Sequence, residues 1–339
     1  MSALHIHRIA PGASVQDMGR TGYLGFGLSR GGAADRLALA EGAALLQQSP
    51  SMAVLELPGA GGIFEAQGAL RIALTGAPMM ARIDGTPVAW NASHLLAKGA
   101  RLEIGAAEAG QYGYLHLGGG LDLPTHMGSR SAHLKAGVGR ALSAGDTLQA
   151  GKDDGRETGL YLPPEGRFEG GTLRCVESLQ TALFDERALA RFLGTEFRRD
   201  PRASRMGAKL NGGGAGFSIA GGLNILSEIT LPGDIQITGD GTPYLLLAES
   251  QTTGGYPRIA TVIPADLPKA AQTPAGAPVR FSLIRRGAAL EAERRMRDDI
   301  TRLPERLRPL VRDPAQMRDL LSYQLISGVT AGDVRFDER

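Results

Sequence analysis

The segment Glu249–Ile263 reads ESQTTGGYPRIATVI and places small polar residues directly before an apolar run. The run Ile259–Ile263 is typical of a buried strand, because it is short and rich in β-branched residues. Before it, Gly254 and Gly255 let the backbone approach a ligand closely, and successive backbone N–H groups can bind an anion. We therefore expect a binding loop at the rim of a β unit. A plain hairpin loop, in which the glycines only satisfy geometry, is the alternative.

Short apolar segments of the same kind recur along the chain, at Ala69–Leu74, Arg101–Ile104, Tyr112–Leu117, Ile235–Thr238 and Tyr244–Ala248. Turn dipeptides such as Asp84-Gly85, Pro232-Gly233 and Asp240-Gly241 punctuate them, and Asp-Gly favours the positive φ angles of tight hairpins. Helical periodicity is confined to a few segments, such as Asp35–Gln48 and Leu183–Leu193, the second followed by Gly194 as an expected C-cap. The sequence therefore predicts a mainly β protein with minor α.

The length of 339 residues suggests two domains. A short repeat supports two related β units, since Gly85-Thr86-Pro87 and Gly241-Thr242-Pro243 occupy corresponding places, although so short a match also arises by chance. The segment Asp153–Arg167 has the composition of a linker. We predict an N-terminal β domain over 1–155, a C-terminal β domain over 156–287 that carries the QTTGGYP motif, and a helical extension over 288–339 packed outside the second β unit.

Composition excludes several classes of function. The formal net charge is +2, and no basic block is interleaved with aromatic residues, which argues against nucleic acid as a partner. Cys175 is the only cysteine, so neither an internal disulfide nor a cysteine-rich zinc site can form. His116, His126 and His133 lack metal-ligand spacing, so we expect no metal. No apolar run reaches the roughly 18 residues of a membrane span, and no secretion signal is recognisable, so we expect a cytoplasmic protein.

The stretch Val15–Tyr23, VQDMGRTGY, brings an amide, a carboxylate and a guanidinium together around Gly19. Arg20 can clamp a carboxylate or phosphate with its planar donor fork. The competing interpretation is an internal ion pair between Asp17 and Arg20 that fixes the N-terminal segment.

Two further motifs carry cationic groups. The motif GSRS, Gly128–Ser131, suits an oxyanion, and equally a polar turn. The motif SRMGAKL, Ser204–Leu210, holds Arg205 and Lys209 four residues apart, a spacing that puts both on one face of a helix, although Gly207 makes a strand or loop equally compatible. No P-loop, dinucleotide-binding glycine motif or nucleophile elbow is present in the sequence.

Taken in order, these motifs resemble one family. They are VQDMGRTGY, GGAAD at Gly31–Asp35, GSRS, GRALSAGD at Gly139–Asp146, SRMGAKL, LPGDIQI at Leu231–Ile237 and QTTGGYPRIATVI. The pattern, which runs from about Val15 to Phe281, looks like the KipA family, also called the allophanate hydrolase subunit 2 or biotin-dependent carboxyltransferase family. The PxpC component of bacterial 5-oxoprolinase belongs to it.

The resemblance implies two cyclophilin-like β-barrels. It also implies a KipI-like partner and a third protein of the LamB/YcsF type, the two other components of 5-oxoprolinase. Together the three proteins use ATP to hydrolyse 5-oxo-L-proline to L-glutamate, and ATP is expected at or near the interface with the KipI-like partner. One alternative is the carboxyltransferase part of a urea carboxylase-like system, in which biotin arrives on another chain. Another is a non-enzymatic antagonist of a KipI-like protein.

The same resemblance suggests which residues form the site. Expected catalytic residues are Arg20, Arg205, Lys209, Gln251 and Thr253. Expected substrate- or nucleotide-binding residues are Gln16, Asp17, Asp35, Ser129, Arg130, Ser131, Gln236, Thr252, Gly254, Gly255 and Tyr256. Positive charge and N–H donors suit this chemistry, because activation of a lactam develops negative charge on its oxygen.

The chain also departs from the family pattern at three places. Relatives carry Gly-Pro where this chain has Glu177-Ser178, and Asp-Arg where it has Glu249-Ser250. They carry Ser-Asp-Arg-Met-Gly where this chain has Ala203-Ser204-Arg205-Met206-Gly207. A changed carboxylate and a missing arginine near the expected site bear on substrate choice.

Overall fold

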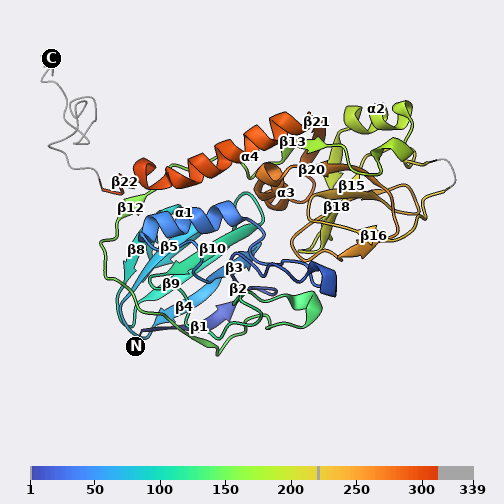
Figure 1. Ribbon diagram of the computed structural model, residues 1–339. Coiled ribbons are helices and arrows are strands. Elements are labelled where there is room, and N and C mark those ends of the chain that lie inside the picture. Colours follow the sequence, from blue (N-terminus) through green and yellow to red (C-terminus); the bar gives the residue numbers. More distant parts are fainter. Residues whose placement is uncertain (1, 220–221, 312–339) are drawn as a thin grey trace, which may run out of the picture.

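The computed structural model describes residues 2–219 and 222–311 (Figure 1). Its first β unit consists of two antiparallel sheets. One sheet has the order β11 (Thr147–Gln149), β1 (Ala3–Ile9), β4 (Gly62–Ala66), β9 (Arg101–Ala107), β6 (Met79–Ile83) and β7 (Thr86–Val88). The other has the order β2 (Ser14–Gln16), β3 (Val54–Pro58), β10 (Tyr112–Leu117), β5 (Leu70–Gly76), β8 (Ala92–Leu96), β12 (Leu160–Tyr161) and β22 (Arg308–Pro309).

The main core of the first unit lies between these sheets. Leu4 and Phe64 come from one sheet, and Leu55 and Ile72 from the other, all fully buried in one cluster. Helix α1 (Arg36–Leu46) covers the opposite face of β5 and β10. Every residue of β5 and β10 is therefore buried, which explains why these strands read as continuous rather than alternating apolar runs.

The second β unit is a closed barrel. Its strands run in the order β13 (Gly171–Val176), β20 (Arg258–Val262), β17 (Asp234–Ile237), β18 (Pro243–Leu246), β15 (Gly207–Asn211), β14 (Phe197–Arg199) and β21 (Pro278–Leu283). Helix α2 (Glu186–Gly194) closes one side of the barrel with Phe192, whose ring stacks on Phe281 at 4.9 Å. A two-stranded ribbon of β16 (Glu228–Ile229) and β19 (Thr253–Gly254) stands beside the barrel.

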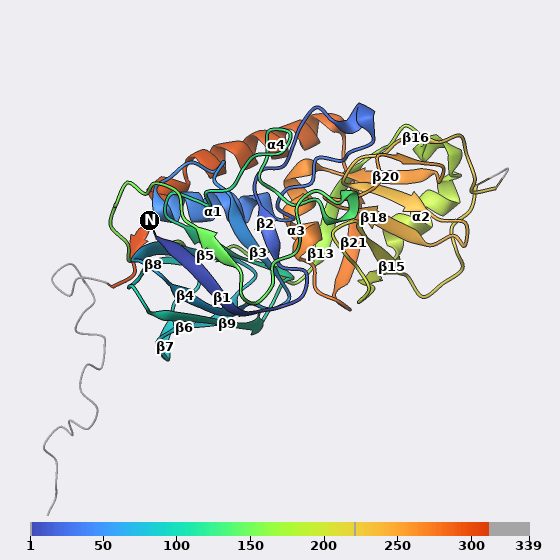
Figure 2. The same cartoon turned by 90° about the horizontal axis from the view of Figure 1, so that it is seen from below.

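The two units meet along one surface, which we call the seam. Helix α3 (Leu267–Gln272) leaves the barrel and reaches β10, where Gln272 binds the backbone of Tyr112. Backbone atoms cross the seam directly, because Gly31 N donates to Ala248 O at 3.1 Å. The view in Figure 2 shows the two units side by side, joined at this surface.

The segment after the barrel contacts both units. Helix α4 (Arg286–Thr301) contacts β13 in the barrel and α1 in the first unit, as Figure 1 shows. Strand β22 then pairs with β12. The expectation that this tail packs on the outside of the second unit is therefore incomplete, since α4 contacts both units. The apolar residues on α4 and after it, such as Ile300 and Leu303, find their partners on α1, and the rest of the predicted extension lies outside the described residues.

The mainly β prediction is confirmed, with differences in detail. Hydrogen bonds close one barrel, whereas the first unit is a pair of sheets. Asp84 and Gly85 form the expected hairpin turn between β6 and β7, with φ of 48° and 79°. Helix α1 begins where predicted, but α2 begins three residues late, because Asp185 caps it through Ala188 N. Gly194 is its last helical residue, not its C-cap. No helix in the described part of the chain is long and apolar enough to cross a membrane.

Candidate functional site

The candidate site is a group of charged side chains in the seam, formed by Arg20, His133, Arg205 and Glu249, which we call the seam cluster. Arg20 and His133 lie on loops of the first unit, and Arg205 and Glu249 precede β15 and follow β18 in the barrel. Two loops of the first unit cross tightly to place Arg20: Arg20 N donates to Arg30 O, and Ala33 N donates to Asp17 O, both at 2.9 Å. Gly32 makes this crossing possible, because a Cβ there would lie 2.5 Å from Gly19 N.

Arg205 is the central cation of the cluster. Its Nε donates to Glu249 Oε1 at 2.7 Å, and its Nη1 donates to Glu56 of strand β3. Burial alone would lower the pKa of Arg205, but the charges of Glu56 and Glu249 raise it above the ordinary value. Since Glu56 also accepts from Tyr114 at 2.8 Å, Arg205 ties the barrel to the core of the first unit.

Arg20 differs from Arg205, because most of its donors have no partner. Its side chain is buried, and Nη2 donates to Ser131 O. Within the described residues, Nε and Nη1 make no hydrogen bond. Burial lowers the pKa of Arg20, and the charges of Asp17 and Glu249 oppose that shift. The predicted ion pair between Asp17 and Arg20 is wrong, since the carboxylate of Asp17 binds other groups instead.

His133 lies between Arg20 and Glu249. Its Nδ1 accepts from Ala136 N at 3.3 Å, so the neutral ring carries its hydrogen on Nε2, which contacts Ser29 Oγ at 2.9 Å. Burial lowers the pKa of His133, Glu249 opposes the shift, and Arg20 adds to it. Because Nε2 donates to Ser29, the histidine is not oriented to remove a proton from that hydroxyl. It is instead a neutral group whose Nδ1 lies 3.9 Å from Glu249 Oε2.

The motif GSRS lies beside Arg20 and is held by Asp17. Asp17 accepts from Ser129 Oγ and from Arg130 N, both at 2.6 Å. Ser131 presents its carbonyl to Arg20, and Arg130 points its Nε toward Leu123 O, away from the cluster. The predicted residues Gln16, Asp17, Ser129 and Ser131 are thus brought together around Arg20, where Gln16 Oε1 is buried without a partner among the described residues.

The loop of the QTTGGYP motif begins at Glu249 and leads away from the seam to the outer ribbon. Ser250 Oγ, next to the cluster, is buried and has no partner in the described structure. Gln251 donates to Gln236 Oε1 at 2.8 Å, and a Cβ on Gly254 would lie 2.4 Å from Gln236 Nε2. Gly254 is thus required for close approach, not for a positive φ. Thr252 is buried, whereas three other residues of the loop are exposed to solvent: Gln251, Thr253 and Tyr256.

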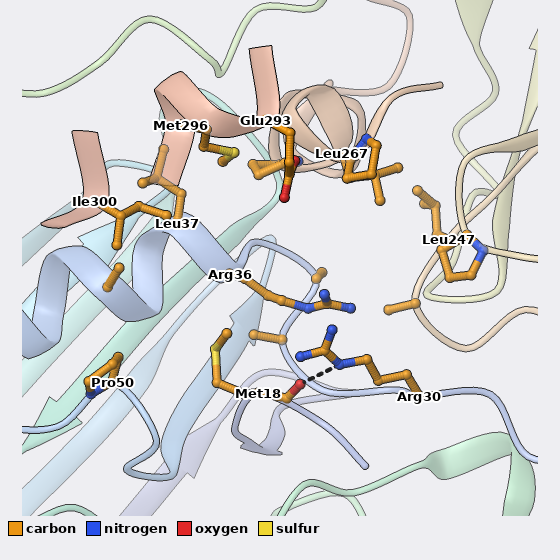
Figure 3. A pocket seen from close by; sticks show the side chains of 17 residues that line it. Met18, Arg30, Arg36, Leu37, Pro50, Leu247, Leu267, Glu293, Met296 and Ile300 are labelled. Carbon is orange, nitrogen blue, oxygen red and sulfur yellow. Dashed lines mark hydrogen bonds between the residues drawn. The ribbon is translucent and has the colours of Figure 1, made fainter. Parts of the chain in front are cut away.

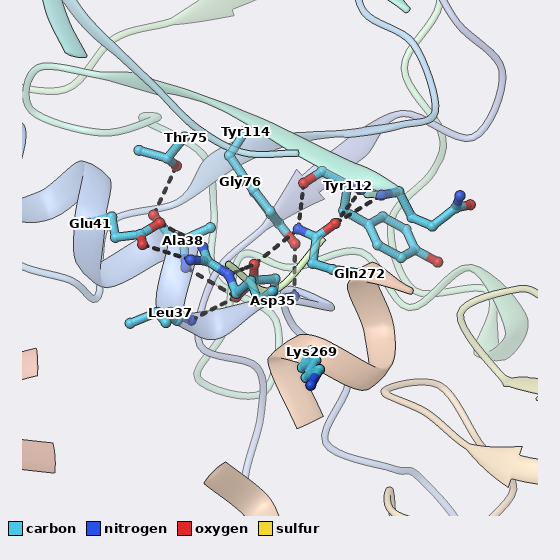
Figure 4. A network of polar contacts seen from close by, with 12 residues as sticks. Asp35, Leu37, Ala38, Glu41, Thr75, Gly76, Tyr112, Tyr114, Lys269 and Gln272 are labelled. Carbon is cyan, nitrogen blue, oxygen red and sulfur yellow. Dashed lines mark hydrogen bonds and ion pairs between the residues drawn. The ribbon is translucent and has the colours of Figure 1, made fainter. Parts of the chain in front are cut away.

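Two further predicted residues lie apart from the cluster. Lys209 lines a separate pocket on the barrel with Asp240 and the glycine-rich loop 212–216. Asp35 belongs to a second network in the seam, the Asp35 network, with Glu41, Arg167 and Gln272 (Figure 4).

The Asp35 network uses all its acceptors. Asp35 Oδ1 caps α1 through Leu37 N and Ala38 N, and its Oδ2 accepts from Arg167 at 2.8 Å and Gln272 at 2.9 Å. Arg167 holds Glu41 with two more bonds, at 2.8 and 2.6 Å. These contacts leave Asp35 no free acceptor for a substrate.

Sequence reasoning missed Ser29, Glu56, His133 and Glu249 as members of the site. His133 was discounted because it lacks metal-ligand spacing, and a single histidine in a loop gives no other signal. Glu56 reads as one polar position in the strand VLELP. Only the fold places it opposite Arg205, which is 149 residues away in the chain.

The chain belongs to the family of the carboxyltransferase domain, subdomain A and B, whose model matches residues 26–283. The match reaches into both β units, with β1, β2 and β22 outside it, and the resemblance read from the motifs is confirmed.

Among curated proteins, the chain is similar to two that are named as the C subunit of 5-oxoprolinase. It is 32% identical to that of Haemophilus influenzae over 276 residues, covering 80% of this chain and 88% of the relative. It is 34% identical to that of Escherichia coli over 297 residues, covering 85% and 94%. The urea amidolyase of Saccharomyces cerevisiae is 25% identical over 80% of this chain, which corresponds to 16% of that much longer protein.

Solved structures give the same picture of the fold. TTHA0988 matches 83% of this chain with a TM-score of 0.77 and 29% identity, and the chain spans 56% of that protein. The K. lactis urea amidolyase matches 92% of this chain with a TM-score of 0.79. At 22% identity that second likeness concerns the fold alone, and the chain spans 21% of the amidolyase.

Proposed function

We propose that this chain is one component of an ATP-dependent 5-oxoprolinase, which converts 5-oxo-L-proline, ATP and water to L-glutamate, ADP and phosphate. The observation that carries the proposal is the alignment with two proteins named as the C subunit of 5-oxoprolinase, over 88% and 94% of their lengths. The partners are two further proteins, one KipI-like and one LamB/YcsF-like. ATP binds at or near the interface with the KipI-like partner.

The seam cluster supplies what lactam activation requires. A ring amide is unreactive because its C–N bond is stabilised by resonance, and phosphorylation of the amide oxygen removes that stabilisation. The reaction places negative charge on oxygen atoms, and donors already withdrawn from water stabilise such charge strongly. Arg20 offers two such donors in the described structure. Because they are enclosed, a substrate reaches them only when the seam opens slightly.

The other members of the site have supporting roles. Glu249 and Arg205 hold each other at 2.7 Å and fix the start of the QTTGGYP loop. His133, neutral because burial lowers its pKa, contacts Ser29 and lies beside Glu249 without adding a second positive charge next to Arg20. The exposed side chains of Gln251, Thr253 and Tyr256 face outward and are available to a partner protein.

Reconstitution tests the proposal directly. The full chain is purified with a KipI-like and a LamB/YcsF-like protein from the same organism, and ADP release from ATP and L-glutamate formation are measured with and without 5-oxo-L-proline. We expect both products to depend on all three proteins and to form in equal amounts. Glutamate formation that persists without this chain would contradict the assignment.

A second candidate function is a carboxyltransferase component. The matched family is described as a carboxyltransferase domain, and urea amidolyases are among the relatives. The same cluster suits this reaction, because an oxyanion also develops when a carboxyl group leaves carboxybiotin. Assay of the chain with a biotin carboxylase, a biotin carrier, bicarbonate and urea distinguishes the two: urea-dependent ADP release, with none from 5-oxo-L-proline, favours the carboxyltransferase.

A further inference from the structure

A cavity of about 320 Å³ lies in the seam on the side of α1 and α4, and Arg20 is not among the residues that line it (Figure 3). Its walls come from α1, α4, α3 and the segment after β18, so both β units contribute. Most of the lining is apolar, from Leu37, Leu247, Leu267, Met296 and Ile300. This volume is in the range of small-molecule sites, and apolar walls with a few polar groups are typical of them.

Two arginines supply the polar part of this cavity. The guanidinium groups of Arg30 and Arg36 point toward one another from opposite sides (Figure 3). Arg30 is fixed by one bond, from Nε to Met18 O at 2.9 Å. Arg36 is the first residue of α1. Within the described residues, its side chain forms no hydrogen bond and no ion pair. Two cations facing one another in a half-enclosed space repel, and an anion between them removes that repulsion.

Electrostatics agree with this geometry. The pKa of Arg36 is lowered to about 10, first by burial and second by the nearby charge of Arg30, while the charge of Glu293 opposes the shift. Burial also lowers the pKa of Arg30. Glu293 lines the same cavity but forms no ion pair with either arginine within 4.0 Å in the described structure; its Oε1 accepts from Arg297, which is four residues along α4. The cavity therefore has two unpaired cations and one carboxylate on its wall.

We propose that this cavity binds a small organic monocarboxylate with an apolar body, its carboxylate held between Arg30 and Arg36. Planar guanidinium groups match a carboxylate in geometry as well as charge. The aliphatic walls select an apolar body, and the negative charge of Glu293 disfavours ligands with a second anionic group. No member of the seam cluster lines this cavity, and the inference does not depend on the proposed function.

Hexanoate is a suitable probe, tested on the unmodified full chain by isothermal titration calorimetry at low ionic strength. We expect hexanoate to bind and each of four other compounds to bind at least about tenfold more weakly. Acetate and inorganic phosphate lack the apolar body, adipate carries a second negative charge, and hexanamide carries no charge. Equal binding of hexanoate and hexanamide would overturn the proposal, since the arginines would then play no part. Binding of phosphate as tight as that of hexanoate would overturn it too.

Variants locate the site. Arg36→Met should weaken hexanoate binding at least about tenfold, by removing a charge-assisted contact, and Glu293→Gln should strengthen it. Arg294→Met is the matched control, because Arg294 is exposed on the same helix and lines no part of this cavity, and it should bind as the unmodified chain does. Arg20→Met should also leave binding unchanged. Loss of binding in Arg20→Met but not in Arg36→Met would place hexanoate in the seam cluster and refute the inference.

Discussion

The seam holds two groups of buried charges that differ in how completely their hydrogen bonds are used. In the Asp35 network, Arg167 meets two carboxylates and Gln272 bonds to Asp35 and to the backbone of β10, so each acceptor has its donor. In the seam cluster, two nitrogens of Arg20 and the nearby Ser250 Oγ are buried without a partner among the described residues. The first arrangement is what a structural joint requires, and the second costs stability unless a ligand completes it.

The difference indicates that the two groups of buried charges have different roles. A saturated network holds α1, the linker and α3 in one arrangement. An unsaturated cluster next to it keeps donors withdrawn from water and ready for an oxygen of the substrate. Substitutions in the two groups should therefore have opposite effects on stability and on turnover.

The largest effect is expected for Arg167→Met. It leaves Asp35 and Glu41 buried without their cation, and breaking a buried pair in this way costs about 3–5 kcal/mol. Urea unfolding followed by circular dichroism measures the loss. Arg187→Met, at an exposed position of α2, is the control and should change the free energy of unfolding by less than about 0.5 kcal/mol. A loss of under about 1 kcal/mol in Arg167→Met would show that the network is not a structural joint.

Arg20→Met should behave in the opposite way. Replacing Arg20 removes the cost of keeping Nε and Nη1 buried without partners and loses only the bond from Nη2 to Ser131 O, so the free energy of unfolding should not fall. Turnover of the reconstituted 5-oxoprolinase should fall about 100-fold, which corresponds to about 2.7 kcal/mol of lost transition-state stabilisation. Arg8→Met, at an exposed position, serves as the control for turnover. A variant that is strongly destabilised yet fully active would reverse the comparison.

His116 is buried against α1, and the pH dependence of the free energy of unfolding tests this region. Its Nε2 contacts Thr75 Oγ1 at 2.8 Å, and that hydroxyl donates to Ala38 O of α1. Burial lowers the pKa of His116 from 6.5 to about 3. Between about pH 6.5 and pH 3, His116 is therefore protonated in the unfolded chain and neutral in the folded chain. In this range the free energy of unfolding falls as pH falls, by about 1.4 kcal/mol per pH unit.

The measurement compares the free energy of unfolding between pH 7 and pH 5 in the unmodified chain, His116→Gln and His126→Gln. His116→Gln should have a shallower dependence on pH, whereas His126→Gln, at an exposed position, should keep the slope of the unmodified chain. Identical slopes in all three proteins would mean that His116 takes up its proton normally in the folded state.

The smallest effect is expected for Gly254→Ala. The added Cβ would meet Gln236 Nε2 at 2.4 Å, so the amide must turn and Gln251 loses its partner. We expect a loss of about 1 kcal/mol together with reduced turnover, measured by thermal unfolding and by ADP release. Gly214→Ala, where a Cβ meets nothing within 4 Å, is the matched control. Unchanged turnover in Gly254→Ala would separate the QTTGGYP loop from the site.

The sequence predicted local structure better than the meeting of distant parts. Strand β5 and helix α1 were found because apolar spacing, the Asp35 cap and turn residues act over a few positions. The contact of Arg205 with Glu56 joins residues 149 apart, and no short-range pattern encodes it. The role of Asp35 was misjudged for the same reason, since Arg167 and Gln272 come from remote segments. The spacing of Lys209 and Arg205 in the sequence predicts that they share a site, but in the fold Lys209 lines another pocket.

Strand β22 has a consequence for how the molecule forms. It pairs with β12, and β12 pairs with β8, so the edge of a sheet in the first unit is finished by Arg308 and Pro309. During synthesis, that edge has no partner strand until the whole barrel and then β22 have left the ribosome. We expect the first half of the nascent chain to keep an open strand edge for much of translation, a stage at which edge-to-edge association with other chains is a hazard.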